Sequence, residues 1–172
     1  MLSHIAILME NQPGALSRVV GLFSQRGYNI DSLSVAPTQD PTLSRLTMTT
    51  SENPEIINQI LRQLYKLVDV VMVQNLSDAE AYSIELAIIK LVSSREKIEK
   101  IISQAKELEG KILEDKDDHI MFEIWGDSKD IDALLASLKE EEFLEVTRSG
   151  LLGMTKGNVA LNTNDQTKIS YD

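Results

Sequence analysis

The chain has 172 residues with 42% hydrophobic but only 5% aromatic content, so aliphatic side chains must fill most of any core. Its formal charge of −10 argues against a nucleic-acid partner, because phosphate contacts need clustered Lys and Arg, and the lack of cysteine excludes disulfides and thiolate metal sites. Since the chain shows neither a membrane-length apolar run nor a signal peptide, we expect a cytoplasmic protein that binds no membrane.

The first predicted elements are a strand, a helix and a second strand. Residues 3–9 are apolar and free of breakers, which indicates a strand. A helix should follow, with Asn11 as its cap and Pro13 in its first turn. Apolar residues recur there at helical spacing until Gly27, which can supply the left-handed residue that ends a helix. The chain then enters a new strand at Asn29.

The same reasoning completes a first unit. Strands are predicted at 30–36, 43–50 and 68–76, with a helix from Pro54 between the last two. The order strand, helix, strand, strand, helix, strand is that of a ferredoxin-like (βαββαβ) unit. Alternation within 43–50 directs Leu46 and Met48 to one face of the sheet. The other face, with Arg45, Thr47 and Thr49, should be wet or only modestly buried.

After a polar link at 77–81 the same order of elements begins again. The predicted segments are strand 82–92, helix 95–108, strand 111–114, strand 120–125, helix 128–138 and strand 143–149. This repeat predicts an α+β protein of two tandem ferredoxin-like units. The expected domains are 1–76 and 82–150, followed by a largely mobile tail at 151–172 that has little apolar content.

The junction of the first strand and the first helix is the candidate binding site. Gly14 has no side chain, so a ligand can approach the backbone, and a helix start offers free N–H groups to a carboxylate. Asn11 and Asn29 can both donate and accept hydrogen bonds, which suits an ammonium beside a carboxylate. The plainer alternative is a capped helix, a Pro-Gly turn and an ordinary strand. The equivalent stretch of the second unit, 92–96, has no Gly or Pro, so the first unit alone should bind the ligand.

A family resemblance rests on the same stretch. Residues 10–19, 21–30 and 32–38 resemble the opening of acetolactate synthase small subunits, and the resemblance continues through 40–45, 63–70 and 148–150. It implies that the first unit is an ACT domain in a non-catalytic regulatory subunit. Such a subunit activates a thiamine-diphosphate-dependent large subunit and confers feedback inhibition by valine or another branched-chain amino acid. Thiamine diphosphate, Mg²⁺ and FAD would belong to the large subunit, and this chain would hold no cofactor.

The resemblance also implies how the effector is bound. Two first units would pair in a homodimer, and the amino acid would lie between them, against the 11–15 loop of one chain and Asn29-Ile30 of the other. Unpaired N–H and C=O groups at a sheet edge favour edge-to-edge pairing. The predicted effector-binding residues are Asn11, Gly14, Ala15, Leu16, Asn29 and Ile30.

Two other classes of function are alternatives. The first is a free-standing amino-acid-sensing ACT protein or a ligand-responsive transcription regulator. The regulator would need a DNA-binding element, and the sequence has no helix-turn-helix pattern or basic stripe. An enzyme would need a base and a nucleophile. Only His4 and His119 offer an imidazole, and no HExxH, P-loop or GxSxG motif occurs, so we expect no catalytic residue and no metal site.

Overall fold

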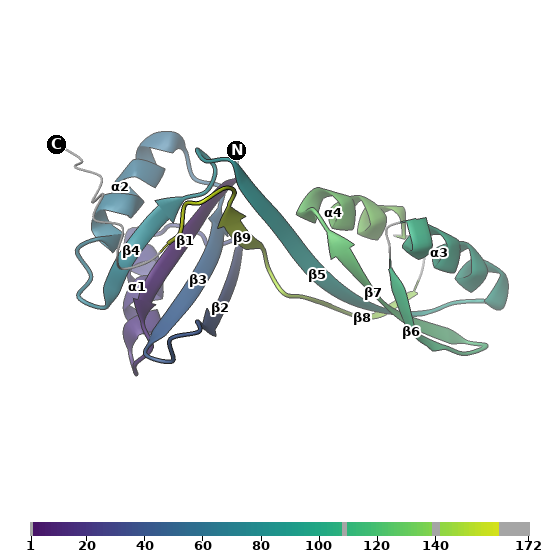
Figure 1. The fold of residues 1–172 in the computed structure, drawn as a ribbon. Helices are drawn as coiled ribbons and strands as arrows, with labels where there is room; N and C mark the ends of the chain where they lie inside the picture. Colours follow the sequence, from purple (N-terminus) through teal and green to yellow (C-terminus); the bar gives the residue numbers. More distant parts are fainter. Residues whose placement is uncertain (1, 108–109, 139–141, 162–172) are drawn as a thin grey trace. The chain divides into compact units, whose positions relative to one another are not determined.

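The computed structural model describes residues 2–107, 110–138 and 142–161, which form two compact units (Figure 1). The first unit contains the chain up to Tyr82 and takes it up again from Leu151, whereas the second runs from Ser83 to Gly150. The prediction of two ferredoxin-like units in an α+β fold is confirmed. None of the described helices is long and apolar enough to cross a membrane.

The first unit has a four-stranded antiparallel sheet in the order β2-β3-β1-β4. Its core lies between the sheet and the two helices, where Ile7 and Met48 pack with Phe23 and Ile60. Because one face of the sheet and one stripe of each helix are apolar, a single layer of helices is enough to bury them. The elements are β1 (Ser3–Glu10), α1 (Ala15–Arg26), β2 (Ser32–Pro37), β3 (Leu43–Thr50), α2 (Pro54–Leu64) and β4 (Val70–Asn75).

Local signals set the ends of these helices. The side chain of Asn53 accepts a hydrogen bond of 2.9 Å from the backbone N–H of Ile56, and Pro54 is the first helical residue of α2. Gly27 ends α1 in the left-handed conformation, with φ 70°, as predicted.

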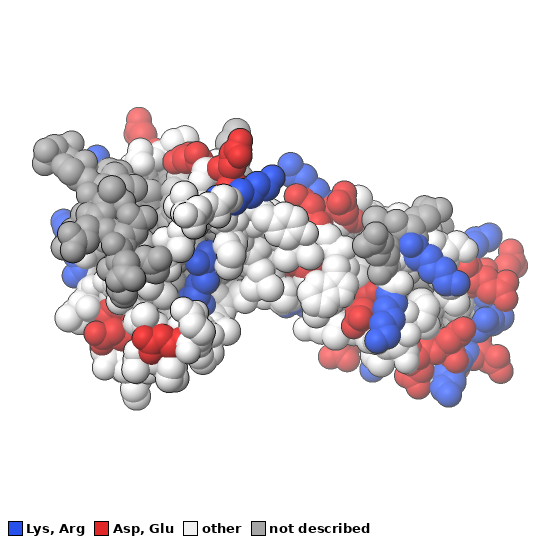
Figure 2. Space-filling view, in the orientation of Figure 1, with Lys and Arg blue, Asp and Glu red and all other residues white. Residues whose placement is uncertain are grey.

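The second unit repeats the order of elements around a separate core. Its sheet has the order β6-β7-β5-β8, and Ile89 and Phe122 pack against Ile98 and Leu134 of the helices. On the face shown in Figure 2, Lys and Arg are interspersed with Asp and Glu over this unit. The elements are β5 (Ala81–Val92), α3 (Arg95–Glu107), β6 (Lys111–Asp115), β7 (His119–Gly126), α4 (Ser128–Ser137) and β8 (Glu142–Arg148).

A buried ion pair fastens the last strand of the second unit. Glu85 is 3% exposed and accepts hydrogen bonds from Arg148 Nε at 2.9 Å and from Arg148 Nη2 at 2.7 Å. Burial acts to raise the pKa of Glu85, but hydrogen bonds from Arg148 and Ser128 outweigh it and leave the pKa lowered. The Ser149 side chain accepts from Leu86 N at 3.0 Å, so the Arg148-Ser149-Gly150 motif holds β8 against β5.

The segment after Gly150 differs from the predicted mobile tail. Leu152–Thr155 form β9, which belongs to the first unit and pairs with β5, the strand whose first two residues, Ala81 and Tyr82, also lie in that unit. The carbonyl of Gly153 accepts a 2.7 Å hydrogen bond from Arg45 Nη2, and a Cβ on Gly153 would stand only 2.6 Å from Leu76 Cδ1. Glycine therefore fits here without displacing the Leu76 side chain. The rest of the predicted tail, from residue 162, lies outside the described residues.

The outer face of the first sheet is therefore more buried than predicted. Thr47 is 4% exposed, and its Cγ2 lies 3.7 Å from the Cβ position of Gly153. Thr49 is 3% exposed, and its hydroxyl pairs with that of Ser32 at 2.7 Å. Strand alternation assigned these residues correctly to the face opposite Leu46 and Met48. It carried no information about the returning strand that covers part of that face.

Candidate effector-binding site

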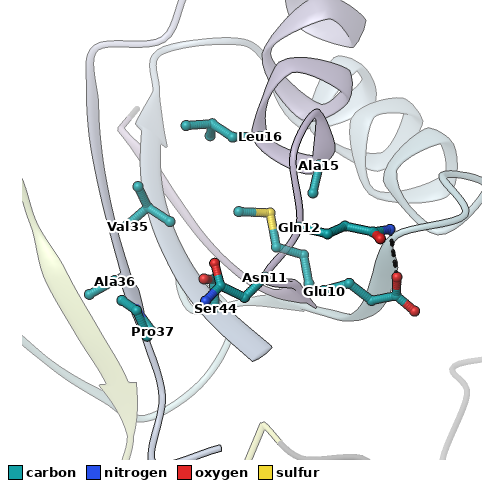
Figure 3. A pocket seen from close by; sticks show the side chains of 10 residues that line it. Glu10, Asn11, Gln12, Ala15, Leu16, Val35, Ala36, Pro37 and Ser44 are labelled. Atoms are coloured by element: carbon teal, nitrogen blue, oxygen red, sulfur yellow. Dashed lines mark hydrogen bonds between the residues drawn. The ribbon is translucent and has the colours of Figure 1, made fainter. Parts of the chain in front are cut away.

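A hollow of about 220 Å³ lies between the β1–α1 loop and β2 (Figure 3). It combines an apolar wall with a few polar groups, the usual composition of a small-molecule site. Three of the six predicted residues, Asn11, Ala15 and Leu16, line it. The other lining residues were not predicted; they are Met9, Glu10, Gln12, Val35, Ala36, Pro37 and Ser44.

The loop before α1 has a different geometry from the predicted cap. Asn11 does not cap the helix; its Nδ2 donates to Pro41 O at 2.9 Å and its backbone N–H to Thr42 O at 2.7 Å. The capping position is Gly14, with φ 90°, and no side chain among the described residues accepts a hydrogen bond from the start of α1. Ala15 N donates to Gln12 O at 3.2 Å, so the N–H groups of the first turn that follow it are the ones a helix start offers to an anion.

Gly14 does not line the hollow, although it adjoins it in sequence. Its left-handed conformation strains any residue with a side chain. A Cβ there would also stand 3.0 Å from Arg18 Nη1, so the guanidinium of Arg18 lies directly over the glycine. Glycine is thus needed at this position partly because of the backbone conformation and the Arg18 side chain, and not only to admit a ligand.

Asn29 and Ile30 lie beyond the opposite end of α1. Twelve helical residues separate them from the loop, a length of about 18 Å at the usual rise of ~1.5 Å per residue. Asn29 is exposed, with Nδ2 donating to Asp31 Oδ1 at 2.7 Å, and its carbonyl accepts from Thr50 Oγ1 at 2.7 Å. Ile30 packs partly against the core. One chain therefore does not bring the six predicted residues together.

The strand beside the hollow is at the edge of the sheet. In the described part of the chain β2 pairs only with β3, which leaves its other edge without a strand. Val35, in this strand, is 39% exposed and lines the hollow together with Ala36 and Pro37. Alternating hydrophobicity predicted the strand but not its place in the sheet, because the period along a strand does not encode its neighbours.

A buried carboxylate that does not line the hollow holds the loop between β1 and α1. Asp69, in the connection from α2 to β4, is 2% exposed and forms an ion pair with Arg18. Its Oδ1 accepts from Gln12 Nε2 at 2.6 Å and its carbonyl from Glu10 N at 2.8 Å. The hydrogen bond from Arg18 lowers the pKa of Asp69, and the one from Gln12 adds to this against the opposing effect of burial. Asp69 is therefore ionised at neutral pH.

The two histidines lie outside the hollow. His119 lies between Asp118 Oδ1 at 2.8 Å and Glu114 Oε2 at 3.4 Å, and both carboxylates raise its pKa by accepting hydrogen bonds from the imidazole, Asp118 more than Glu114. His4 lies in β1, where its backbone N–H donates to Ser77 Oγ at 2.8 Å. Among the described residues, no group of three or more His, Asp or Glu side chains could hold a metal ion.

Comparison with known proteins covers both units. The AHAS small subunit-like ACT domain family matches residues 5–72, and the family described as small subunit of acetolactate synthase matches residues 84–157. The first match confirms the prediction that the first unit is an ACT domain.

Curated relatives and a solved structure extend over nearly the whole chain. The acetolactate synthase isozyme 3 small subunit of Salmonella typhimurium is 42% identical over 155 residues, 90% of this chain and 95% of the relative. The acetolactate synthase small subunit of Haemophilus influenzae is 43% identical over 157 residues, 89% of this chain and 94% of the relative. The crystal structure of the acetolactate synthase small subunit from Thermotoga maritima is 31% identical, with a TM-score of 0.82, covering 92% of this chain and 99% of that one. The chain belongs to the acetolactate synthase small-subunit family.

Proposed function

We propose that this chain is the regulatory subunit of an acetolactate synthase and has no catalytic activity of its own. It docks on a separate thiamine-diphosphate-dependent catalytic subunit, raises its activity and makes it sensitive to valine or another branched-chain amino acid. Thiamine diphosphate, Mg²⁺ and FAD belong to that catalytic subunit. The observation that supports this most is the hollow beside an uncapped helix start in the first unit, in a chain of this family.

The proposed binding site is completed by a second copy of the chain. The free edge of β2 borders the hollow, and pairing it with β2 of a second chain gives an isologous dimer. In an antiparallel pairing centred on Ser32–Pro37, Pro37 lies opposite Ser32 of the partner subunit. Asn29 and Ile30 of the partner subunit then follow just beyond the hollow. This arrangement explains how residues about 18 Å apart in one chain can serve one ligand.

The groups around the hollow match the parts of a branched-chain amino acid. Backbone N–H groups at the start of α1 suit the carboxylate, which the helix dipole also favours. Asn11 uses its Nδ2 on Pro41 O, which leaves Oδ1 to accept from an ammonium, and the carboxylate of Glu10 lies in the same lining. Leu16 and Val35 offer apolar surface to the branched side chain.

The test measures acetolactate formation by the chain reconstituted with its catalytic subunit, against rising valine. Asn29→His replaces an exposed amide that can both donate and accept, and loses about 1–3 kcal/mol of effector binding. Asn58→His, on the exposed face of α2, is the matched control. We expect Asn29→His to activate the catalytic subunit normally but to resist valine, and Asn58→His to behave as wild type.

Gly14→Asp is the second variant, because it adds a carboxylate beside Arg18 at the start of α1, where its negative charge opposes binding of the ligand's carboxylate. The φ of 90° at Gly14 adds backbone strain of about 1–3 kcal/mol, so Gly14→Ala serves as a control with the same strain and no charge. Inhibition should be weaker in Gly14→Asp than in Gly14→Ala. If Asn29→His and Gly14→Asp both keep the wild-type inhibition curve, the effector binds elsewhere. Failure of the wild-type chain to retain a thiamine enzyme from cell extract would reject the regulatory role and favour a free-standing sensor.

A further inference from the structure

We propose that Asp69 is a positioning residue for the effector loop, residues 10–14, and that Gly14 is needed so that Arg18 can reach Asp69. The proposal rests on the proposed function in taking this loop as the effector site. It differs from the sequence-based interpretation, in which Gly14 serves only to admit a ligand.

Asp69 contacts the loop at both of its ends and inside it. Its carbonyl accepts from Glu10 N at 2.8 Å, where β1 ends, and its Oδ1 accepts from Gln12 Nε2 at 2.6 Å. Its Oδ2 is ion-paired with Arg18 in the first turns of α1. Glu10 and Gln12 line the hollow, whereas Asp69 does not. Asp69 therefore sets the position of lining residues without occupying the site.

The amide of Gln12 shows how this arrangement affects the lining. Nε2 donates both to Asp69 Oδ1 and to Glu10 Oε2, at 2.6 and 2.7 Å (Figure 3 draws the second). The side chain is thus held between a buried carboxylate and one in the hollow. If Asp69 were an amide, it could present an NH₂ group instead of an oxygen to Gln12 or Arg18. A carboxylate accepts from both at once, which is why the position suits Asp.

Burial makes these contacts obligatory for the carboxylate. At 2% exposure Asp69 has lost nearly all access to water, so its charge must be compensated by the protein. Arg18 in α1, whose side chain is 45% exposed, supplies the compensating positive charge. Loss of the Arg18–Asp69 ion pair would therefore destabilise the folded unit as well as release the loop.

Gly14 lies in the path of that contact. A Cβ on residue 14 would stand 3.0 Å from Arg18 Nη1 and 3.6 Å from its Cζ. Any side chain at this position must displace the guanidinium or be displaced by it, in addition to the strain at φ 90°. Gly14, Arg18 and Asp69 consequently form one unit: the glycine gives the arginine room, and the arginine holds the carboxylate that holds the loop.

The experiment uses the full-length chain and compares Asp69→Asn, Gly14→Ala and the double variant. Valine affinity is measured by calorimetry on protein that remains folded, and unfolding midpoints are measured in parallel. We expect each single variant to bind valine about tenfold more weakly, the size of one charge-assisted contact. The double variant should be little weaker than the weaker single variant, because both changes weaken the same Arg18–Asp69 contact.

Two further arms separate positioning from stability. Asp78→Asn, just beyond the other end of β4, is the matched control. It also removes a carboxylate that accepts from a side-chain amide, that of Asn75 at 2.6 Å, and it should leave valine affinity unchanged. Arg18→Lys keeps the charge and should recover part of the loss seen with Arg18→Ala. Hydrogen exchange at Asn11 and Gln12 should quicken in Asp69→Asn even without valine.

The outcomes are distinct. A lower unfolding midpoint with unchanged valine affinity in Asp69→Asn would make Asp69 purely structural and overturn the proposal. Fully additive losses in the double variant would overturn the role given to Gly14. If the wild-type chain binds no branched-chain amino acid, the proposed function fails, and the hydrogen-exchange result still decides whether Asp69 holds the loop.

Discussion

Adding one methyl group at Gly153 tests whether β9 is packed tightly on the first unit. The new Cβ would stand 2.6 Å from Leu76 Cδ1, and Leu76 is only 3% exposed. Gly153 is not among the glycines with positive φ, so the effect is steric and not conformational. Either Leu76 changes its rotamer or β9 moves away from the sheet and weakens the 2.7 Å hydrogen bond from Arg45.

The expected loss is of the size seen when cores are overpacked, about 1–3 kcal/mol. The contacted atom is the end of a flexible side chain, which favours the lower half of that range. Gly21→Ala is the matched control within the same unit: it lies inside α1, and a Cβ there meets nothing within 4 Å. Since Ala is preferred to Gly in a helix interior, this change should stabilise by about 0.5–1 kcal/mol.

The assay is urea unfolding of both variants and wild type at one protein concentration, because the proposed dimer would make the midpoint depend on concentration. The same chemical change should shift the midpoint in opposite directions at the two sites. A Gly153→Ala protein as stable as wild type would refute the close packing of β9. A destabilised Gly21→Ala protein would refute the assumption that the α1 surface there is free.

Arg148→Ala should destabilise the second unit by about 1–3 kcal/mol by leaving Glu85 unpaired; the full cost of a buried pair is not expected, because the Arg148 side chain is 32% exposed. Denaturant unfolding with Arg148→Lys as control measures this, and equal stability of all three proteins would contradict it. His119 has a raised pKa because of Asp118, so its contribution is complete below the unfolded value near 6.5 and is lost as pH rises through the folded one. Stability should therefore fall above pH ~6.5 in wild type, and this slope should be missing in His119→Gln. Removing the α2 cap in Asn53→Ala should cost about 1 kcal/mol, measured by the same unfolding assay.

The sequence could predict what depends on local periodicity and turn chemistry. The start of α2 at Pro54 and the left-handed Gly27 each depend on residues within one or two turns. The repeat of element order was readable for the same reason. Alternation along β3 also placed Thr47 and Thr49 on the correct face of the sheet.

The rest depends on partners distant in sequence. Asn11 was predicted to cap α1, but its amide donates to Pro41, 30 residues away. Asp69 follows exposed Val68 with no pattern that marks it as buried, and its partner Arg18 is 51 residues away. β9 has only four residues, too few for a clear alternation, and its contacts with Leu76 and Arg45 join residues far apart in the sequence. Contacts of this kind leave no period in a single sequence.

The two units share an architecture but differ in the turn between their first strand and first helix, which supports the proposal that only the first binds the effector. In the second unit the chain passes from β5 to α3 through Ser93 and Ser94, and the carbonyl of Ser94 accepts from two backbone N–H groups in the first turn of the helix. Arg95 there pairs with Asp115 at 2.5 Å, so the start of α3 is tied to its own unit. In the first unit the equivalent turn is longer, contains a left-handed glycine and has no side-chain cap. Asp69 holds this loop but does not line the hollow, so the side of the loop that lines the hollow stays open to a ligand. The first unit thus differs from the second in two features of this turn: the left-handed Gly14, and an anchor, Asp69, that lies outside the hollow.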